Sequence, residues 1–245
     1  MFRQEVLDRI KVITHSCVRI GGEKVIYIDP VGIKGAPHDA DIIFFTHLHL
    51  DHFSPLEARK LMKDNTVIVA PKSMALPCRL FLSSKGNSHV MLVPGQETQI
   101  SGIPVKAVAA YNNKKPFHPK GNGWLGYVLT IDGTDIYITG DTDITSECSS
   151  VSCDILMLPV GGFFTIDAAE AAQLTNTVAP HTVIPIHYGL CNGGKDAPER
   201  FRSRVNDGII TDIRPEVYNS IVLMMYVKAF AAAAAVFLIT YLLLR

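Results

Sequence analysis

"FFTHLHLDHF", residues 44–53, places three histidines and one aspartate within six consecutive positions. The segment follows a short apolar run, "DIIFF" (41–45), which is typical of a buried strand. The whole chain has nine histidines, so a third of them lie in this window. Neither strand packing nor an ordinary loop requires such a group. We therefore interpret it as a metal-binding segment, and its candidate ligands are His47, His49, Asp51 and His52.

The bulk composition is that of a folded chain with balanced charge. Of the 245 residues, 48% are hydrophobic and 19% charged, which supports a substantial core and argues against disorder. The 23 basic and 23 acidic residues cancel, so the composition does not favour a nucleic-acid binder. The five cysteines show no C-x-x-C spacing, which favours reduced thiols in a cytoplasmic domain. The N-terminal segment mixes charges of both signs and does not resemble a signal peptide.

Short runs rich in Val, Ile, Tyr and Phe recur along the chain and predict strands at 9–14, 24–29, 41–46, 66–70, 90–93, 105–110, 126–131, 135–139, 154–159 and 182–186. Helices are predicted at 54–62, 167–178 and 197–205. The first opens with Ser54, Pro55 and Glu57, and the second with Asp167 and Glu170, both as capping boxes. Strands outnumber helices and the two interleave, which favours an α+β fold of two sheets covered by helices.

Three further candidate ligands lie far from the first segment. Asp141 and His187 each follow a predicted strand directly, and His118 lies in the Gly/Pro-rich loop "NNKKPFHPKGNGW" (112–124). Taken singly, Asp141 could be a turn carboxylate, and either histidine could be an ordinary polar residue. Together with the first segment they give seven imidazole or carboxylate ligands, more than one ion needs. This donor set favours two divalent transition-metal ions, with Zn as the first choice and Mn or Fe as alternatives.

Five motifs now make the sequence recognisable: "THLHLDH" (46–52), "YNNKKPFHPKGNGWLGY" (111–127), "YITGDTD" (137–143), "LPVGGFFTIDAAEAA" (158–172) and "IPIHYG" (184–189). The chain resembles the metallo-β-lactamase fold superfamily, in its branch of metal-dependent hydrolases related to L-ascorbate-6-phosphate lactonase. The resemblance implies a four-layer αββα sandwich. It also implies that one ion is held by His47, His49 and His118, the other by Asp51, His52 and His187, with Asp141 bridging.

Two ions at such a site can share a water molecule and produce hydroxide at neutral pH. We expect this hydroxide to attack an ester-like bond, with lactones first among the possible substrates and with Asp51 orienting the hydroxide and accepting its proton. The catalytic candidates are therefore Asp51 and Asp141. A phosphodiesterase or phospholipase-type hydrolase at the same site is an alternative, because the same ions suit phosphoryl oxygens. A non-catalytic, membrane-associated metal-binding protein is another.

Weaker candidates for substrate contact are His15, Asn112, Lys115 and Phe164. The resemblance also allows His15 to support a ligand, or it could equally be a buried histidine bonded to backbone. Phe164 could simply pack in the core. Lys115 could be a solvated loop residue, or it could help to hold an anionic group of the substrate beside the ions. The expected partner is thus a small-molecule substrate, possibly anionic, and no nucleic acid.

The C-terminal segment differs from the rest of the chain. Residues 221–244 are apolar except for Lys228 and Thr240. As a helix of about 1.5 Å per residue this stretch is about 36 Å long, enough for a hydrocarbon core of about 30 Å. We therefore divide the chain into a hydrolase domain at 1–217 and an apolar C-terminal helix at 218–245. The helix is expected to anchor the cytoplasmic domain in a membrane, or alternatively to pack in a homo-oligomer interface.

Overall fold

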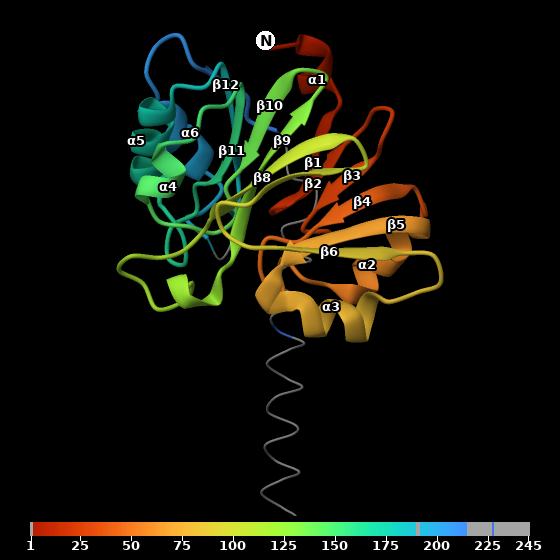
Figure 1. The fold of residues 1–245 in the computed structure, drawn as a ribbon. Coiled ribbons are helices and arrows are strands. Elements are labelled where there is room, and N and C mark those ends of the chain that lie inside the picture. The colour runs from red at the N-terminus through yellow and green to blue at the C-terminus, as the bar shows by residue number, and fades with distance from the viewer. Residues whose placement is uncertain (1, 190–191, 215–226, 228–245) are drawn as a thin grey trace, which may run out of the picture.

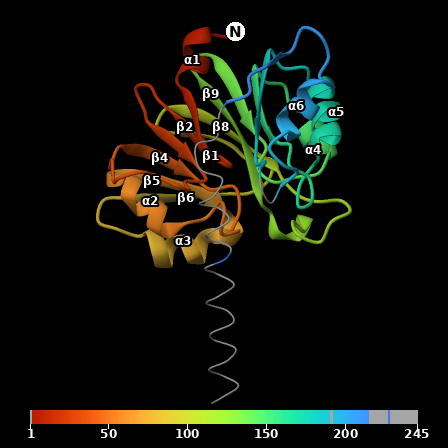
Figure 2. The same cartoon turned by 180° about the vertical axis from the view of Figure 1, so that it is seen from behind.

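The computed structural model describes residues 2–189, 192–214 and Val227. Two β-sheets lie face to face in it, and helices cover their outer faces (Figures 1 and 2). The first sheet consists of β1 (Ile10–Thr14), β2 (Cys17–Ile20), β3 (Ile26–Ile28), β4 (Ala40–Phe44), β5 (Met62–Pro71) and β6 (Ser88–Leu92), in that order. The second has the order β13 (Ile210–Thr211), β12 (Thr182–Ile186), β11 (Ile155–Pro159), β10 (Thr134–Ile138), β9 (Leu125–Ile131), β8 (Ile103–Ala109) and β7 (Glu97–Ile100).

The helices segregate by sheet. They are α1 (Gln4–Asp8), α2 (Pro55–Leu61), α3 (Ala75–Leu82), α4 (Ser146–Ser149), α5 (Ala168–Val178) and α6 (Ala197–Arg202), with short 3-10 turns η1 (Lys72–Met74) and η2 (Lys120–Asn122). Helices α2 and α3 pack on the outer face of the first sheet through residues such as Leu61 and Cys78. Helices α4, α5 and α6 pack on the second sheet through residues such as Leu174 and Phe201. The predicted αββα layering is thereby confirmed for the described residues.

The central core lies between the two sheets. It joins inward-facing side chains such as Ile28 and Phe44 of the first sheet to Tyr127 and Ile184 of the second, all of them buried. Strands that are covered on both faces have few polar positions, which is why β11 and β12 are buried along their whole length. This rigid, doubly covered scaffold positions the loops at its edges.

The topology gathers several strand ends at one edge. Strand β4 runs parallel to β3 and β5, and β10, β11 and β12 run parallel to one another. The carboxyl ends of parallel neighbours meet on the same side of a sheet, where ligands bind in open α/β sheets. Residues directly after β3, β4, β10 and β12 therefore lie close together in space, although they are far apart in the sequence.

The helix starts bear out most of the capping prediction. Asp167 Oδ1 accepts from the backbone N–H of Glu170 at 2.9 Å, and Glu170 Oε2 accepts from that of Asp167 at 3.1 Å, which completes the capping box of α5. At α2 only half of the box forms: Ser54 Oγ accepts from Glu57 N at 3.4 Å. The Glu57 carboxylate turns instead to the backbone N–H of Ile33 at 2.6 Å, because that buried donor has no strand partner there.

Several elements were not predicted. They are the helices α1, α3 and α4 and the strands β2, β7 and β13. Helix α3 contains Pro77 and has no side-chain cap, so it lacks the local start signal that marked α2 and α5. The expected C-terminal helix and the boundary at residue 217 lie outside the described residues. Among the helices that are described, none is long and apolar enough to cross a membrane.

Candidate metal centre

Loops from both sheets converge at the edge of the sandwich. The segment after β4 brings His47, His49, Asp51 and His52, and the turns after β10 and β12 bring Asp141 and His187. His118 comes from the loop between β8 and β9, and His15 from the β1–β2 turn. All seven predicted ligands therefore meet at one place. They form two groups, and within each group the candidate ligand atoms lie within 4.8 Å of one another.

The first group consists of His47, His49, His118 and Asp141. His47 Nε2 lies 3.1 Å from His49 Nδ1, and His118 Nε2 lies 3.3 Å from Asp141 Oδ2. Three of these residues are buried, and His49 is partly exposed. The half-buried indole of Trp124 packs against the cluster, with its ring centre 5.0 Å from that of His47 and 4.9 Å from that of His49. The indole therefore restricts the imidazole orientations and shields one side from water.

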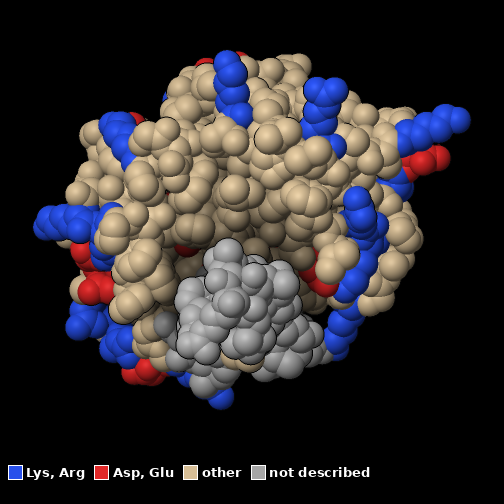
Figure 3. Space-filling model, turned by 90° about the horizontal axis from the view of Figure 1, so that it is seen from below, with Lys and Arg blue, Asp and Glu red and all other residues tan. Residues whose placement is uncertain are grey.

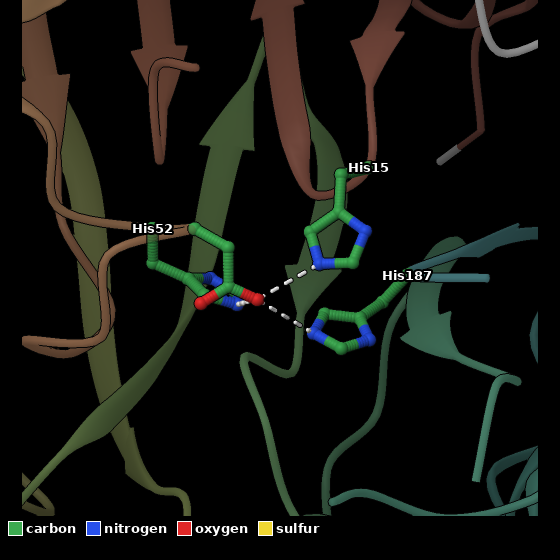
Figure 4. Close-up of side chains that lie close together, drawn as sticks. His15, His52 and His187 are labelled. Carbon is green, nitrogen blue, oxygen red and sulfur yellow. Dashed lines mark hydrogen bonds and ion pairs between the residues drawn. The ribbon is translucent and has the colours of Figure 1, made fainter. Parts of the chain in front are cut away.

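The second group consists of His15, Asp51, His52 and His187, all buried. Figure 4 shows the three labelled imidazoles around one carboxylate, which the contacts identify as that of Asp51. Its Oδ2 lies 3.0 Å from His15 Nε2, 3.6 Å from His187 Nε2 and 3.7 Å from His52 Nε2. His15 was predicted to contact substrate, to support a ligand, or to be a buried histidine. The side chain is 1% exposed and belongs to this group, either as a ligand or as the residue that fixes Asp51, which agrees with the supporting role.

Asp141 lies between the two groups. Its Oδ2 is 3.3 Å from His118 Nε2 in the first group and 3.2 Å from His187 Nε2 in the second. The same oxygen is 3.8 Å from His47 Nε2 and 3.5 Å from His52 Nε2. One carboxylate oxygen is thus surrounded by four imidazole nitrogens from both sides. This is the arrangement that a bridging ligand needs.

Hydrogen bonds behind the imidazoles set which nitrogen faces the centre. His52 Nδ1 lies 2.8 Å from a carboxylate oxygen of Asp29, and His118 Nδ1 lies 2.8 Å from the side-chain oxygen of Asn112. Both partners accept, so in the neutral form of each ring Nδ1 carries the proton and Nε2 keeps its lone pair. Thr46 Oγ1 donates to Asp29 at 2.6 Å and lies 2.9 Å from His47 Nδ1, which extends the same support to His47.

The residues present fit metal ions. Several inward-facing atoms are buried and have no hydrogen-bond partner: His52 Nε2, His118 Nε2, His187 Nε2 and Asp51 Oδ1. Buried polar atoms are normally paired, because an unpaired one costs about 1–3 kcal/mol. Four such atoms converging on two ligand groups are explained by coordination. A set of imidazoles and carboxylates favours Zn, Mn or Fe over Ca or Mg.

The electrostatics indicate a site that attracts positive charge. Burial opposes ionisation of Asp51 and Asp141, but the surrounding histidines outweigh it and hold the pKa of both carboxyls well below the usual value. Burial alone would lower the pKa of His187, yet Asp141 raises it to about 9. The pKa of His52 is likewise raised well above its usual value, against burial, by Asp141 and Asp51. Burial and the neighbouring His187 lower the pKa of His15 to about 4.

Unusual backbone conformations hold the site in place. His15, Asp29 and His187 have positive φ values of 53°, 46° and 53°, which are unfavourable for residues with a Cβ and typical of functional sites. Gly140, at φ 64°, turns the chain into Asp141. A Cβ there would lie 2.9 Å from Leu125 O and 3.2 Å from Thr46 Cβ, so only glycine lets the two ligand loops approach.

A cavity of about 310 Å³ opens over both ligand groups. The described residues that line it are Leu48, His49, Leu50, Asp51, Phe117, Asp141, Phe164 and His187. Phe164 therefore takes the pocket-lining place that was predicted for it. A Cβ at the nearby Gly161 would lie 2.5 Å from His187 O, which explains the glycine before the two phenylalanines. A larger cavity of about 400 Å³, lined by Tyr111 and residues of β8, contains no candidate ligand.

The other two weak candidates have partners within the protein. Asn112 is buried and uses its side-chain oxygen for His118, and it donates its amide to Asp143 at 3.0 Å. It therefore positions a ligand rather than substrate. Lys115 Nζ donates to Asp143 at 2.7 Å and to the carbonyl of Thr165 at 2.9 Å. Substrate contact by Lys115 stays a prediction, and this geometry gives it a structural use instead.

Sequence reasoning missed several residues of the site. Asp29 is the most important, since its carboxylate supports both Thr46 and His52. It ends the predicted strand at 24–29, and a carboxylate at a strand end was the signal used for Asp141. Leu48 and Leu50, which lie between the ligands, and Phe117, which precedes His118, were overlooked because apolar residues are not ligands.

A family model described as a beta-lactamase superfamily domain matches residues 9–187. The chain belongs to the metallo-β-lactamase superfamily. It is 32% identical over 203 residues to a UPF0173 metal-dependent hydrolase of Methanoregula boonei, covering 76% of this chain and 87% of that protein. A relative of the same name in Thermoplasma acidophilum is 28% identical over 233 residues, 88% of this chain and 99% of that protein.

Solved structures agree with this assignment. A crystal structure from Parabacteroides distasonis, named as that of a metal-dependent hydrolase, matches with a TM-score of 0.71 at 28% identity. The match covers 84% of this chain and 92% of that chain. The present protein is thus a metal-dependent hydrolase of the metallo-β-lactamase superfamily. The names of these relatives give no substrate.

Proposed function

We propose that the protein is a dinuclear metal-dependent hydrolase that cleaves an ester-like bond, such as that of a lactone. The observation that carries this proposal is the position of Asp141 Oδ2, which lies 3.2–3.8 Å from imidazole nitrogens of both ligand groups. His47, His49 and His118 would hold one ion. Asp51, His52 and His187, with His15 beside them, would hold the other. Zn is the first choice of metal, and Mn and Fe have the same ligand preferences.

The chemistry divides between the ions and the chain. Two bound divalent ions would polarise the oxygen of the bond under attack and lower the pKa of a water molecule toward neutrality. Asp51 lines the cavity, and its Oδ1 is free of hydrogen bonds while His15 holds its Oδ2. Oδ1 would ligate the second ion, and Asp51 is thereby placed beside the attacking water to orient it and to accept its proton. Trp124 and the cavity walls exclude other water from the ligands.

A carbonyl ester is favoured over a phosphodiester by the cavity itself. Its described lining contains no Lys or Arg side chain that would add to the charge of the ions in binding a phosphate. Figure 3 views the molecule from below, the side where α3 lies in Figure 1, and on this one face the visible Lys and Arg side chains lie mainly around the outline rather than in one basic patch across it. A nucleic-acid backbone needs such a patch.

The test is reconstitution with each metal, followed by elemental analysis and an activity screen. We expect two ions per chain and hydrolysis of lactones or carboxylic esters, with little activity on phosphodiesters and phospholipids. One ion or none in folded, reconstituted protein would contradict the dinuclear site. Turnover of phosphodiesters alone would contradict the proposal that the substrate is a lactone or carboxylic ester.

A further inference from the structure

The rim of the metal-centre cavity is apolar. Leu48 and Leu50 alternate with the ligands of the first motif, and they are 43% and 48% exposed. Phe117 is 37% exposed and lines the same cavity. A single exposed leucine on a surface needs no explanation, but several large apolar side chains around one opening mark a binding site. Coordination of ions does not require any of these three side chains.

Phe163 gives an independent indication. Its side chain is 70% exposed, and its backbone has φ 60°, a conformation that is unfavourable for a bulky residue. Neither burial nor local backbone preference therefore favours phenylalanine here. Its ring centre lies 4.6 Å from that of Phe164, which in turn lies 4.6 Å from that of Phe117. The strained residue thus extends the cavity wall outward, and strain beside a site commonly reflects function.

The charges near the cavity argue against an anionic substrate group. No Lys or Arg is among the described residues that line it. The two lysines of the adjoining loop with resolved contacts are engaged elsewhere: Lys115 with Asp143 at 2.7 Å, and Lys120 with Glu147 at 2.9 Å. A phosphorylated sugar lactone would therefore meet leucine and phenylalanine where it needs cations.

We propose that the substrate is an acyl ester or alkyl-substituted lactone whose carbonyl reaches the ligand groups, while an uncharged aliphatic or aromatic chain lies against Leu48, Leu50 and the three phenylalanines. This inference rests on the proposed hydrolase function and specifies its substrate. The reaction consumes one water: the acyl carbon–oxygen bond breaks, the acid keeps the water oxygen, and the alcohol oxygen takes a proton.

The experiment compares kcat/KM for metal-loaded protein on p-nitrophenyl acetate, butyrate and octanoate, and on γ-butyrolactone and γ-octalactone. Each methylene that is fully transferred from water to an apolar site gives about a 4-fold gain, and a half-exposed contact about 2-fold. The four methylenes between butyrate and octanoate should therefore raise kcat/KM by about 15-fold to about 250-fold. Phe163→Gly and Leu50→Ser should each reduce the octanoate-to-butyrate ratio of kcat/KM several-fold. Glycine also relieves the strained φ at 163, so folding is not at risk.

Ile210→Ala is the matched control, because Ile210 is an equally exposed apolar residue (50%) on β13 that does not line the cavity. It should keep the wild-type ratio. Equal kcat/KM across the series, or a preference for a phosphorylated lactone, would overturn the inference. If no ester or lactone is cleaved, the proposed function fails instead. In that case, binding of 1-butanol and 1-octanol, measured by calorimetry, tests the rim alone. Octanol should bind more tightly than butanol, and Phe163→Gly should remove the difference. Equal binding of the two alcohols to the wild-type protein would overturn the inference of an apolar substrate site.

Discussion

Asp29 fixes the ligand form of His52, and replacing it with asparagine isolates that role. The carboxylate is 1% exposed and accepts from Thr46 N at 2.8 Å, from Thr46 Oγ1 at 2.6 Å and from His52 Nδ1 at 2.8 Å. An ionised carboxylate only accepts hydrogen bonds, so the proton of His52 stays on Nδ1. Its Nε2 is then free for an ion.

The Asp29→Asn substitution keeps the shape of the side chain but replaces one accepting carboxylate oxygen with a donating NH₂ group. If the amide oxygen stays toward the backbone N–H of Thr46, the amide NH₂ faces His52 Nδ1 and makes that nitrogen an acceptor. The imidazole proton then moves to Nε2, which can no longer ligate. Changes to such supporting partners typically cost 10–100-fold in metal affinity, or about 1.4–2.7 kcal/mol. The weakened hydrogen bonds add about 1–3 kcal/mol of lost folding stability.

The assay is competition for Zn against a chromophoric chelator, with thermal unfolding recorded in parallel. We expect one of the two sites to weaken by about 10–100-fold and the other to change little. Asp41→Asn is the control: Asp41 also accepts from a backbone N–H, that of Val25 at 2.8 Å, and pairs with Lys63 at 2.9 Å, but it contacts no candidate ligand. If Asp29→Asn binds both ions as tightly as this control, the tautomer of His52 does not set the metal affinity.

Three further predictions concern the ions and the tail. Asp141→Ala should lose at least one bound ion and nearly all turnover with an unchanged circular dichroism spectrum, since its oxygen serves both groups; two ions by elemental analysis would contradict this. Chelation should lower Tm without unfolding the protein, because the three apolar clusters contain none of the ligands. For each ion present at about 1,000 times its Kd, the loss of stability is about 4 kcal/mol, a fall in Tm of about 8–16 °C per ion removed. Loss of the far-UV spectrum at 25 °C would refute this prediction. Full-length protein should stay with membranes after an alkaline carbonate wash while a chain truncated after Asn219 does not; a soluble full-length oligomer would instead make 221–244 an assembly helix.

The sequence by itself determined the features that depend on neighbouring residues. Alternation and apolar runs located most strands, because side-chain periodicity follows directly from strand geometry. The cap of α5 was readable because Asp167 and Glu170 satisfy each other's backbone N–H groups within one turn. The ligands of "THLHLDH" were recognisable for the same reason: four donors in six residues are conspicuous without any fold.

Only the tertiary structure decided how distant residues act on one another. His15 and Asp51 are 36 positions apart, and nothing near His15 in the sequence indicates that its Nε2 meets that carboxylate. Lys115 looked available for a substrate until the fold placed Asp143 and the carbonyl of Thr165 beside it. By residue type, Leu50 looks like a core residue, and Phe163 could pack in the core or line a pocket. Their exposure at the cavity rim depends on which loops meet there, and that is set by the packing of two sheets rather than by local preference.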